Sequence, residues 1–236
     1  MAVVNTNIGA SVAQAALAKN ERALGAAMEQ LSTGKRINAA GDDASGLAIS
    51  ARMTSQIRGL ETSIRNANDA ISMVDTAEGA LDEITEMLQR IRELAIQSGT
   101  GTTAEDDRTY LNAEFEALRS EIERVATNTE WNGRAILAGA AGGGSSDTVT
   151  FQVGVDGGQT LAVDFGDFSS GTTMASMHGA TGLTASTVAK GIAQAASVIT
   201  ISDVAIAAVS TQRATFGATS NRLTHAVDNL TSVKTN

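Results

Sequence analysis

From residue 57 to residue 95 the chain reads IRGLETSIRNANDAISMVDTAEGALDEITEMLQRIRELA, and this stretch decides the fold. Its apolar residues recur at spacings of three and four, which is the period of one face of an α-helix. One position repeats every seven residues, and its companion shifts by one residue partway along, as expected in a nearly straight helix. The predicted seam consists of Ile57, Leu60, Ile64, Ala67, Ile71, Val74, Leu81, Ile84, Leu88, Ile91 and Ala95.

The pattern predicts one helix from about Thr54 to Ser98, a rod of roughly 65 to 70 Å at 1.5 Å per residue. An average globular helix has only about 11 to 12 residues. The chain contains no proline, the residue that breaks helices most effectively. A helix of this length needs long partners to cover its apolar face.

Two further helices supply those partners. One is predicted over 104–128, with Thr103 as its N-cap, acidic residues at 105–107 and apolar residues from Leu111 to Val125. The other runs from about Thr187 to Val233, and its seam is interrupted by the polar residues Ser202, Arg213 and Ser220, which can fix register. We predict a shared core that includes Leu60, Ile64, Ile71, Val74, Leu81, Leu88, Leu111, Phe115, Ile199, Ile206, Phe216 and Leu223.

Between these helices the apolar period changes from 3.6 to 2. Alternation from Val149 to Val155 and from Leu161 to Phe165, around Asp156-Gly157-Gly158, predicts a β-hairpin at 148–166. The N-terminal 41 residues have a looser helical pattern made mostly of alanine, so that helix cannot bury much surface alone. The predicted fold class is mainly α: an elongated antiparallel bundle of long helices with a small β-hairpin region.

Composition excludes several classes of function. The chain has 236 residues, no cysteine, and 17 basic against 26 acidic residues, for a net charge of -9. It therefore has no disulfide or thiolate chemistry, and its field repels nucleic acid and anionic membranes, which we do not expect as partners. No basic n-region of a secretory signal peptide opens the chain, so an exported protein of this sequence needs another route.

No motif predicts an enzyme, and we expect no catalytic, cofactor-binding or metal-binding residue. The two histidines, His178 and His225, have no further ligand at metal spacing, and the Gly99-Thr-Gly101 string follows a helix instead of a strand. Two features still need an explanation. The apolar faces of the predicted helices are longer than a small globular protein requires, and the alanine-rich N-terminal helix cannot fold alone. The residues by themselves therefore favour self-assembly.

Several strings resemble one family. They are Leu31-Ser-Thr-Gly-Lys-Arg-Ile-Asn38, Gly41-Asp-Asp-Ala-Ser-Gly-Leu-Ala-Ile-Ser50, Arg65-Asn-Ala-Asn-Asp69, Leu88-Gln-Arg-Ile-Arg-Glu-Leu94 and Asn132-Gly133, followed later by Gln212-Arg213, Phe216-Gly217-Ala218 and Asn221-Arg222-Leu223. Together they resemble the two conserved regions of bacterial flagellin, the subunit of the flagellar filament. The resemblance covers most of residues 1–168 and 185–233, in order.

The resemblance implies an organisation and a location. Residues 1–42 would be the N-terminal inner-tube helix and its linker, 43–168 a helical core layer with the hairpin, 169–186 a vestigial variable region, and 187–236 the returning core helix. Flagellins continue into a last helix that pairs with the first and meets an export chaperone, so we expect these 236 residues to stay monomeric or weakly associated. The implied location is the extracellular bacterial flagellum, reached without a cleaved signal peptide.

The resemblance also implies partners and a receptor site. The principal partner is a second copy of the chain, in a filament that serves motility. The string at 88–94 resembles the flagellin segment that the innate sensor Toll-like receptor 5 binds. The resemblance therefore implies a receptor-binding role for Gln89, Arg90, Leu94 and Glu114. From the spacing we expect Arg90 and Leu94 to share an exposed face. The alternatives are a hook-filament junction protein and a helical adhesin-like protein.

Overall fold

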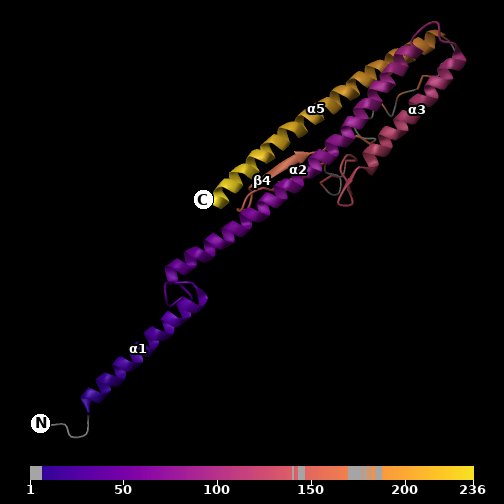
Figure 1. Cartoon of the computed structure of the whole chain (residues 1–236). Helices are drawn as coiled ribbons and strands as arrows, with labels where there is room; N and C mark the ends of the chain where they lie inside the picture. The colour runs from indigo at the N-terminus through magenta and orange to yellow at the C-terminus, as the bar shows by residue number, and fades with distance from the viewer. Residues whose placement is uncertain are drawn as a thin grey trace. The chain divides into compact units, whose positions relative to one another are not determined.

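The computed structural model describes residues 7–139, 141–142, 147–169, 177, 180, 182–183 and 188–236. Its contacts divide the chain into two compact units, Met1–Arg58 and Gly59–Asn236. Long helices and short antiparallel strand pairs make up the described part (Figure 1). The predicted fold class, mainly α with long antiparallel helices and a β-hairpin, is confirmed.

The first unit contains helix α1, Ile8–Thr33. The side chain of Asn7 caps its first turn by accepting from the amide of Ala10, and Gly34 ends it with a left-handed φ of 65° that favours glycine. None of the α1 residues is buried. The helix thus buries no apolar surface of its own, as its alanine-rich sequence predicts.

Two aspartates order the segment between α1 and the next helix. One carboxylate oxygen of Asp42 accepts from the amides of Asn38 and Ala39, at 3.0 Å each, and the carboxylate of Asp43 accepts from the amide of Gly46 at 2.8 Å. These backbone hydrogen bonds lower the pKa of both carboxyls. Asp43 thereby starts helix α2, Ala44–Ser98, ten residues before the position that the apolar pattern predicts.

The buried face of α2 in the second unit follows a seven-residue repeat, with Met73 and Leu94 buried beside it. Its core positions alternate at spacings of three and four: Leu60, Ser63, Ala67, Ala70, Val74, Ala77, Leu81, Ile84, Leu88, Ile91, Ala95 and Ser98. The expected one-residue shift of the companion position is therefore wrong. Small Ser63 and Ala70 occupy the buried places, while Ile64 and Ile71 are only partly buried and Ile57 is 39% exposed.

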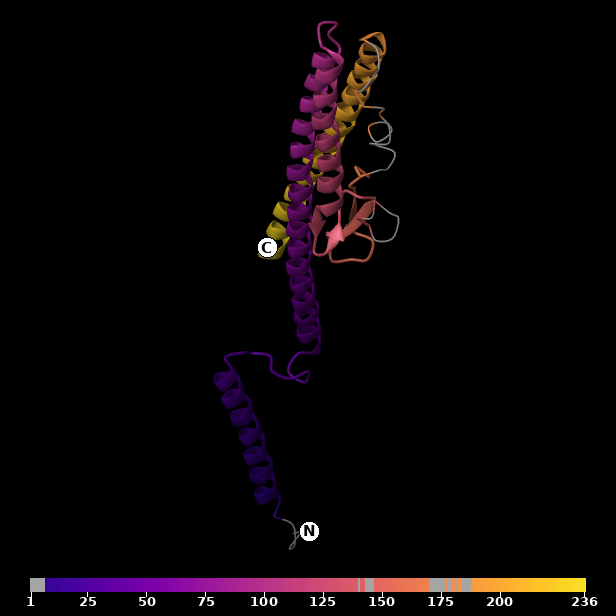
Figure 2. The same cartoon turned by 90° about the vertical axis from the view of Figure 1, so that its right-hand side faces the viewer.

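Helices α3, Glu105–Asn128, and α5, Val188–Thr235, lie alongside α2 (Figures 1 and 2). Both follow the predicted ranges within two residues. The predicted cap is wrong, because the N-cap of α3 is Ala104, without a side-chain hydrogen bond, and the hydroxyl of Thr103 donates instead to the carbonyl of Gln97. By length and composition alone α5 could cross a membrane, a test that core helices of globular proteins also pass.

The predicted hairpin forms from β3, Thr148–Gln152, and β4, Thr160–Asp164, with Val149 opposite Val163. A second, smaller pair joins β1, Glu130–Trp131, to β2, Arg134–Ala135. Its turn places Asn132 and Gly133 at positive φ, the conformation that an Asn-Gly hairpin turn requires. The sequence signal for this pair was the Asn-Gly dipeptide itself.

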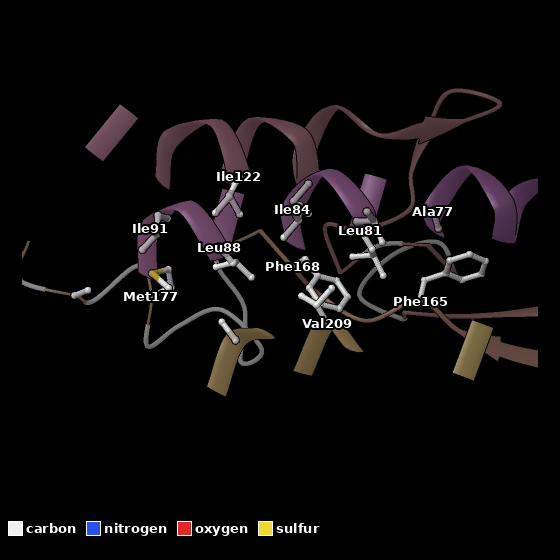
Figure 3. Packing of buried hydrophobic residues seen from close by; sticks show 14 of the residues in the cluster. Ala77, Leu81, Ile84, Leu88, Ile91, Ile122, Phe165, Phe168, Met177 and Val209 are labelled. Carbon is white, nitrogen blue, oxygen red and sulfur yellow. The ribbon is translucent and has the colours of Figure 1, made fainter. Parts of the chain in front are cut away.

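One large cluster of buried residues joins the three helices and the hairpin segment. Figure 3 shows Leu81, Ile84 and Leu88 of α2 with Phe168 and Val209 among them. Of the predicted core residues, those fully or almost fully buried are Leu60, Val74, Leu81, Leu88, Phe115, Phe216 and Leu223. The others, which are partly buried, are Ile64, Ile71, Leu111, Ile199 and Ile206.

A buried arginine closes the end of α2. Arg108 is 1% exposed, and its guanidinium donates to the carbonyls of Ser98 at 3.1 Å and Thr100 at 2.9 Å. Helix ends leave such carbonyls without partners, and a cation there also interacts favourably with the helix dipole. Arg108 therefore serves as a side-chain cap supplied by the neighbouring helix.

Candidate interaction surface

Arg90 links α2 to α3 on the surface of the second unit. Its Nε donates to Glu114 Oε1 at 2.8 Å, and its Nη1 donates to Glu93 Oε2 at 3.1 Å. The three side chains are between 44% and 67% exposed. The hydrogen bond to Glu114, followed by that to Glu93, raises the pKa of Arg90, so the guanidinium stays charged.

The structure brings Arg90 and Glu114 together as the resemblance implies, with Gln89 also exposed beside them. Glu93 is an addition that sequence reasoning missed. Its signal was the spacing of three residues from Arg90, at which helical side chains meet.

Leu94 is placed differently from the expectation. It is 0% exposed and belongs to the main buried cluster, so it cannot be an exposed apolar anchor in this structure. Because Arg90 reaches α3, the residue one turn further on the same side of α2 also faces that helix. The four-residue spacing was correct, but Leu94 is buried in the main cluster and not part of the exposed face.

A second exposed surface runs along α1. Leu17, Leu24, Met28 and Leu31 share one face of the helix, the apolar stripe, and are 63% to 80% exposed, whereas the exposed Ile8 and Val12 lie on the other side. Burial of one such side chain is worth about 1.5 to 3 kcal/mol. An isolated helix is only marginally stable in water, and none of the α1 residues is buried. The stripe is therefore a surface that gains stability from a partner.

The described residues offer no group of three or more His, Asp or Glu side chains that could hold a metal ion. His225 is exposed on α5, and His178 lies outside the described residues. Neither surface contains a nucleophile positioned beside a base. Both are suited to binding a macromolecule.

Comparison with known proteins identifies the family. Residues 4–141 match the model of the bacterial flagellin N-terminal helical region. A flagellin of Halalkalibacterium halodurans is 41% identical over 234 residues, which cover 99% of this chain and 82% of that protein. The chain belongs to the bacterial flagellin family. The sequence resemblance is thus confirmed, and α1 through β2 are the elements of the matched flagellin region that the structure describes.

Solved structures agree with this flagellin assignment. The crystal structure of Bacillus cereus flagellin matches with a TM-score of 0.59 at 33% identity, covering 70% of this chain and 88% of that one. A putative flagellar hook-associated protein of Vibrio parahaemolyticus matches with a TM-score of 0.66 at 16% identity and covers 83% of this chain. That second likeness shows a shared fold alone, so it does not favour a junction protein over a filament flagellin.

Proposed function

We propose that this flagellin is a self-assembling structural subunit of the extracellular flagellar filament, acting in motility. The observation that carries the proposal is the exposed apolar stripe of α1 in a chain of this family. A 26-residue helix with no buried residue is stabilised when another helix covers that stripe. The partner in a homopolymer is a second copy of the chain. The proposal includes export by a route without a cleaved signal peptide, assisted by a chaperone.

Substitutions on α1 test the assembly role. The paired variant Leu24→Asp/Met28→Asp places two charges on the stripe and should abolish filament formation by the full-length protein, measured by pelleting and electron microscopy. The melting temperature of the second unit should not change, because α1 has no buried residue. A matched control, Ala15→Asp/Ala26→Asp, adds two charges at exposed α1 positions on the other side of the helix and should assemble. Filaments of normal length from the paired variant would contradict the role of the stripe.

We also propose that the monomer is recognised by Toll-like receptor 5 through Gln89, Arg90 and Glu114. The support is the string at 88–94 together with the exposed Arg90–Glu114 pair, which presents a held guanidinium and free carboxylate lone pairs on one surface. A planar guanidinium can fork onto receptor carbonyl or carboxylate groups, a frequent feature of interface hot spots. Leu94 takes no direct part, because it is buried.

A receptor-reporter titration tests this recognition. Arg90→Ala should weaken the response at least about tenfold, which corresponds to roughly 1.4 kcal/mol. Arg65→Ala is the control, since Arg65 is an exposed arginine on the same helix that donates to Thr62 instead. Equal loss in both variants, or no signal from the parent protein, would remove receptor recognition while leaving the filament role untouched.

A further inference from the structure

Three ion pairs between α2 and α5 share a single alignment of the two helices. Arg92 Nε lies 2.7 Å from Asp203 Oδ1, Arg213 Nη1 lies 2.8 Å from Asp82 Oδ1, and Lys234 Nζ lies 2.9 Å from Glu61 Oε1. We call these three pairs the ion-pair ladder.

The spacings along the ladder match on both helices. Twenty-one residues separate Glu61 from Asp82, and twenty-one separate Arg213 from Lys234. Ten residues separate Asp82 from Arg92, and ten separate Asp203 from Arg213. In antiparallel helices equal spacings place every pair at the same axial register. A misaligned pair of helices would therefore lose all three contacts together.

Many positions of the apolar seam specify this register only weakly, although the buried Phe216 also contacts Phe165 of the hairpin segment. The seam repeats every seven residues, and many of its buried positions on both helices hold small side chains: Ser63, Ala67, Ala70, Ala77 and Ala95 on α2, and Ala195, Ser202 and Ala205 on α5. A shift of α5 by seven residues keeps one seam facing the other. Seams that repeat in this way need polar or charged positions to exclude the shifted alignments.

The ladder excludes both seven-residue shifts. In one direction Asp82 and Arg92 would face Ser220 and Ser210. In the other direction the ladder residues of α2 would face only apolar side chains, namely Val227, Ile206 and Ala196. Neither shifted alignment offers Asp82 or Arg92 a charged partner.

A steric contact at the end of the bundle supports the same register. Gly191 of α5 lies against the buried side chain of Arg108, and a Cβ at residue 191 would lie 2.9 Å from Arg108 Nε. A seven-residue shift in the first direction would bring Val198 to this place. The branched side chain of valine cannot fit where a single Cβ already collides.

We propose that the ion-pair ladder is a register lock, which selects one antiparallel alignment of α2 and α5 against alignments shifted by one heptad. Glu78, 3.8 Å from Arg213, is a second carboxylate on the same rung. An isolated exposed ion pair adds little stability. The lock acts through the difference between registers, because the correct alignment makes every rung and the shifted ones make none.

Electron–electron distance measurement between spin labels tests the lock. The chain has no cysteine, so labels on Ser72→Cys and Thr200→Cys report a single distance. Both positions are exposed and lie far apart along the bundle axis. A seven-residue shift would change their separation by about 10 Å, at 1.5 Å per residue.

Three variants of this spin-labelled chain distinguish a change of helix register from an effect of net charge. The one-sided variant, Glu61→Lys/Glu78→Lys/Asp82→Lys/Arg92→Glu, places like charges on every rung. The swapped variant adds Asp203→Lys, Arg213→Glu and Lys234→Glu, which restores opposite charges. The control, Arg65→Glu/Asp75→Lys/Glu83→Lys/Glu86→Lys, changes the net charge of α2 by the same amount at other exposed positions of that helix.

The one-sided variant should show a population displaced by about 10 Å, or should fail to fold, whereas the swapped and control variants keep the parent distance. Adding about 1 M salt should reduce the displaced population, since the Debye length falls to about 3 Å. A one-sided variant with the parent distance and melting temperature would overturn the proposal. So would a swapped variant that behaves no better than the one-sided one.

Discussion

Arg108 of α3 and Gly191 of α5 are in direct contact at the end of the bundle, where a Cβ on residue 191 would lie 2.9 Å from Arg108 Nε and 3.1 Å from Cδ. Arg108 cannot move away freely, because it caps the carbonyls of Ser98 and Thr100. Three helices therefore meet around one buried cation. The glycine is needed for space and not for its backbone freedom, since residue 191 lies within a helix.

The substitution Gly191→Ala should destabilise the protein despite the higher helix propensity of alanine. Alanine gains about 0.5 to 1 kcal/mol over glycine in a helix interior. Overpacking against a fixed side chain costs about 1 to 3 kcal/mol. Gly217→Ala, elsewhere on α5, is the control: no atom lies within 4 Å of its Cβ position, so it should stabilise. Thermal melting should show a lower melting temperature for Gly191→Ala and a higher one for Gly217→Ala than for the parent protein.

The substitution Leu81→Ala should cost about 2 to 5 kcal/mol, because Leu81 is 0% exposed at the middle of the main cluster. Ile96→Ala, on the same helix but 50% exposed, should cost far less. Denaturant unfolding of the two variants measures the difference. Equal losses would mean that the buried face of α2 has been assigned to the wrong side.

The helices could be predicted from the sequence because large apolar residues mark their period, but the buried face could be predicted only in part. From Leu81 to Ile91 the seam is made of large residues, and the prediction there is correct. Between Leu60 and Met73 small residues fill the buried positions, and burial of Ser63 or Ala70 leaves no hydrophobic signal. The start of α2 was missed for a related reason: an aspartate cap, and not apolar burial, begins the helix.

The candidate surface, too, could be predicted from the sequence only in part. The family resemblance assigns Arg90 and Glu114 to one receptor site, and their ion pair is a finding of the structure. The burial of Leu94 could not be predicted, because a helical repeat gives the side of α2 on which a residue lies but not what covers that side. The capping role of Arg108 could not be predicted from the sequence either, because its partners are backbone carbonyls ten and eight residues away.

Limited proteolysis should cut the first unit before the second. Trypsin has sites on and just after α1 at Lys19, Arg22, Lys35 and Arg36, and none of the α1 residues is buried. Cleavage requires local unfolding, which costs little where few buried contacts exist. Mass spectrometry of the early fragments should therefore show cuts before Gly41 and a resistant remainder. Equally early cuts inside α3 or α5 would contradict this order.

The stability of the hairpin region should respond to pH through Asp147. Burial, followed by the charges of Asp164 and Asp167, raises the pKa of the Asp147 carboxyl. Since the folded state binds this proton more tightly than the unfolded state, the contribution of Asp147 is favourable at low pH and is lost as pH rises through its folded pKa.

The substitution Asp147→Asn removes the charge and leaves the backbone carbonyl that accepts from Phe165. The variant should melt at a higher temperature than the parent at pH 7, and the gain should shrink as pH falls and the parent carboxyl becomes protonated. Asp75→Asn, the same chemical change at an exposed position of α2, serves as the control for the substitution itself. A gain for Asp147→Asn that stays constant from pH 7 to acid pH would mean that the effect comes from packing and not from charge.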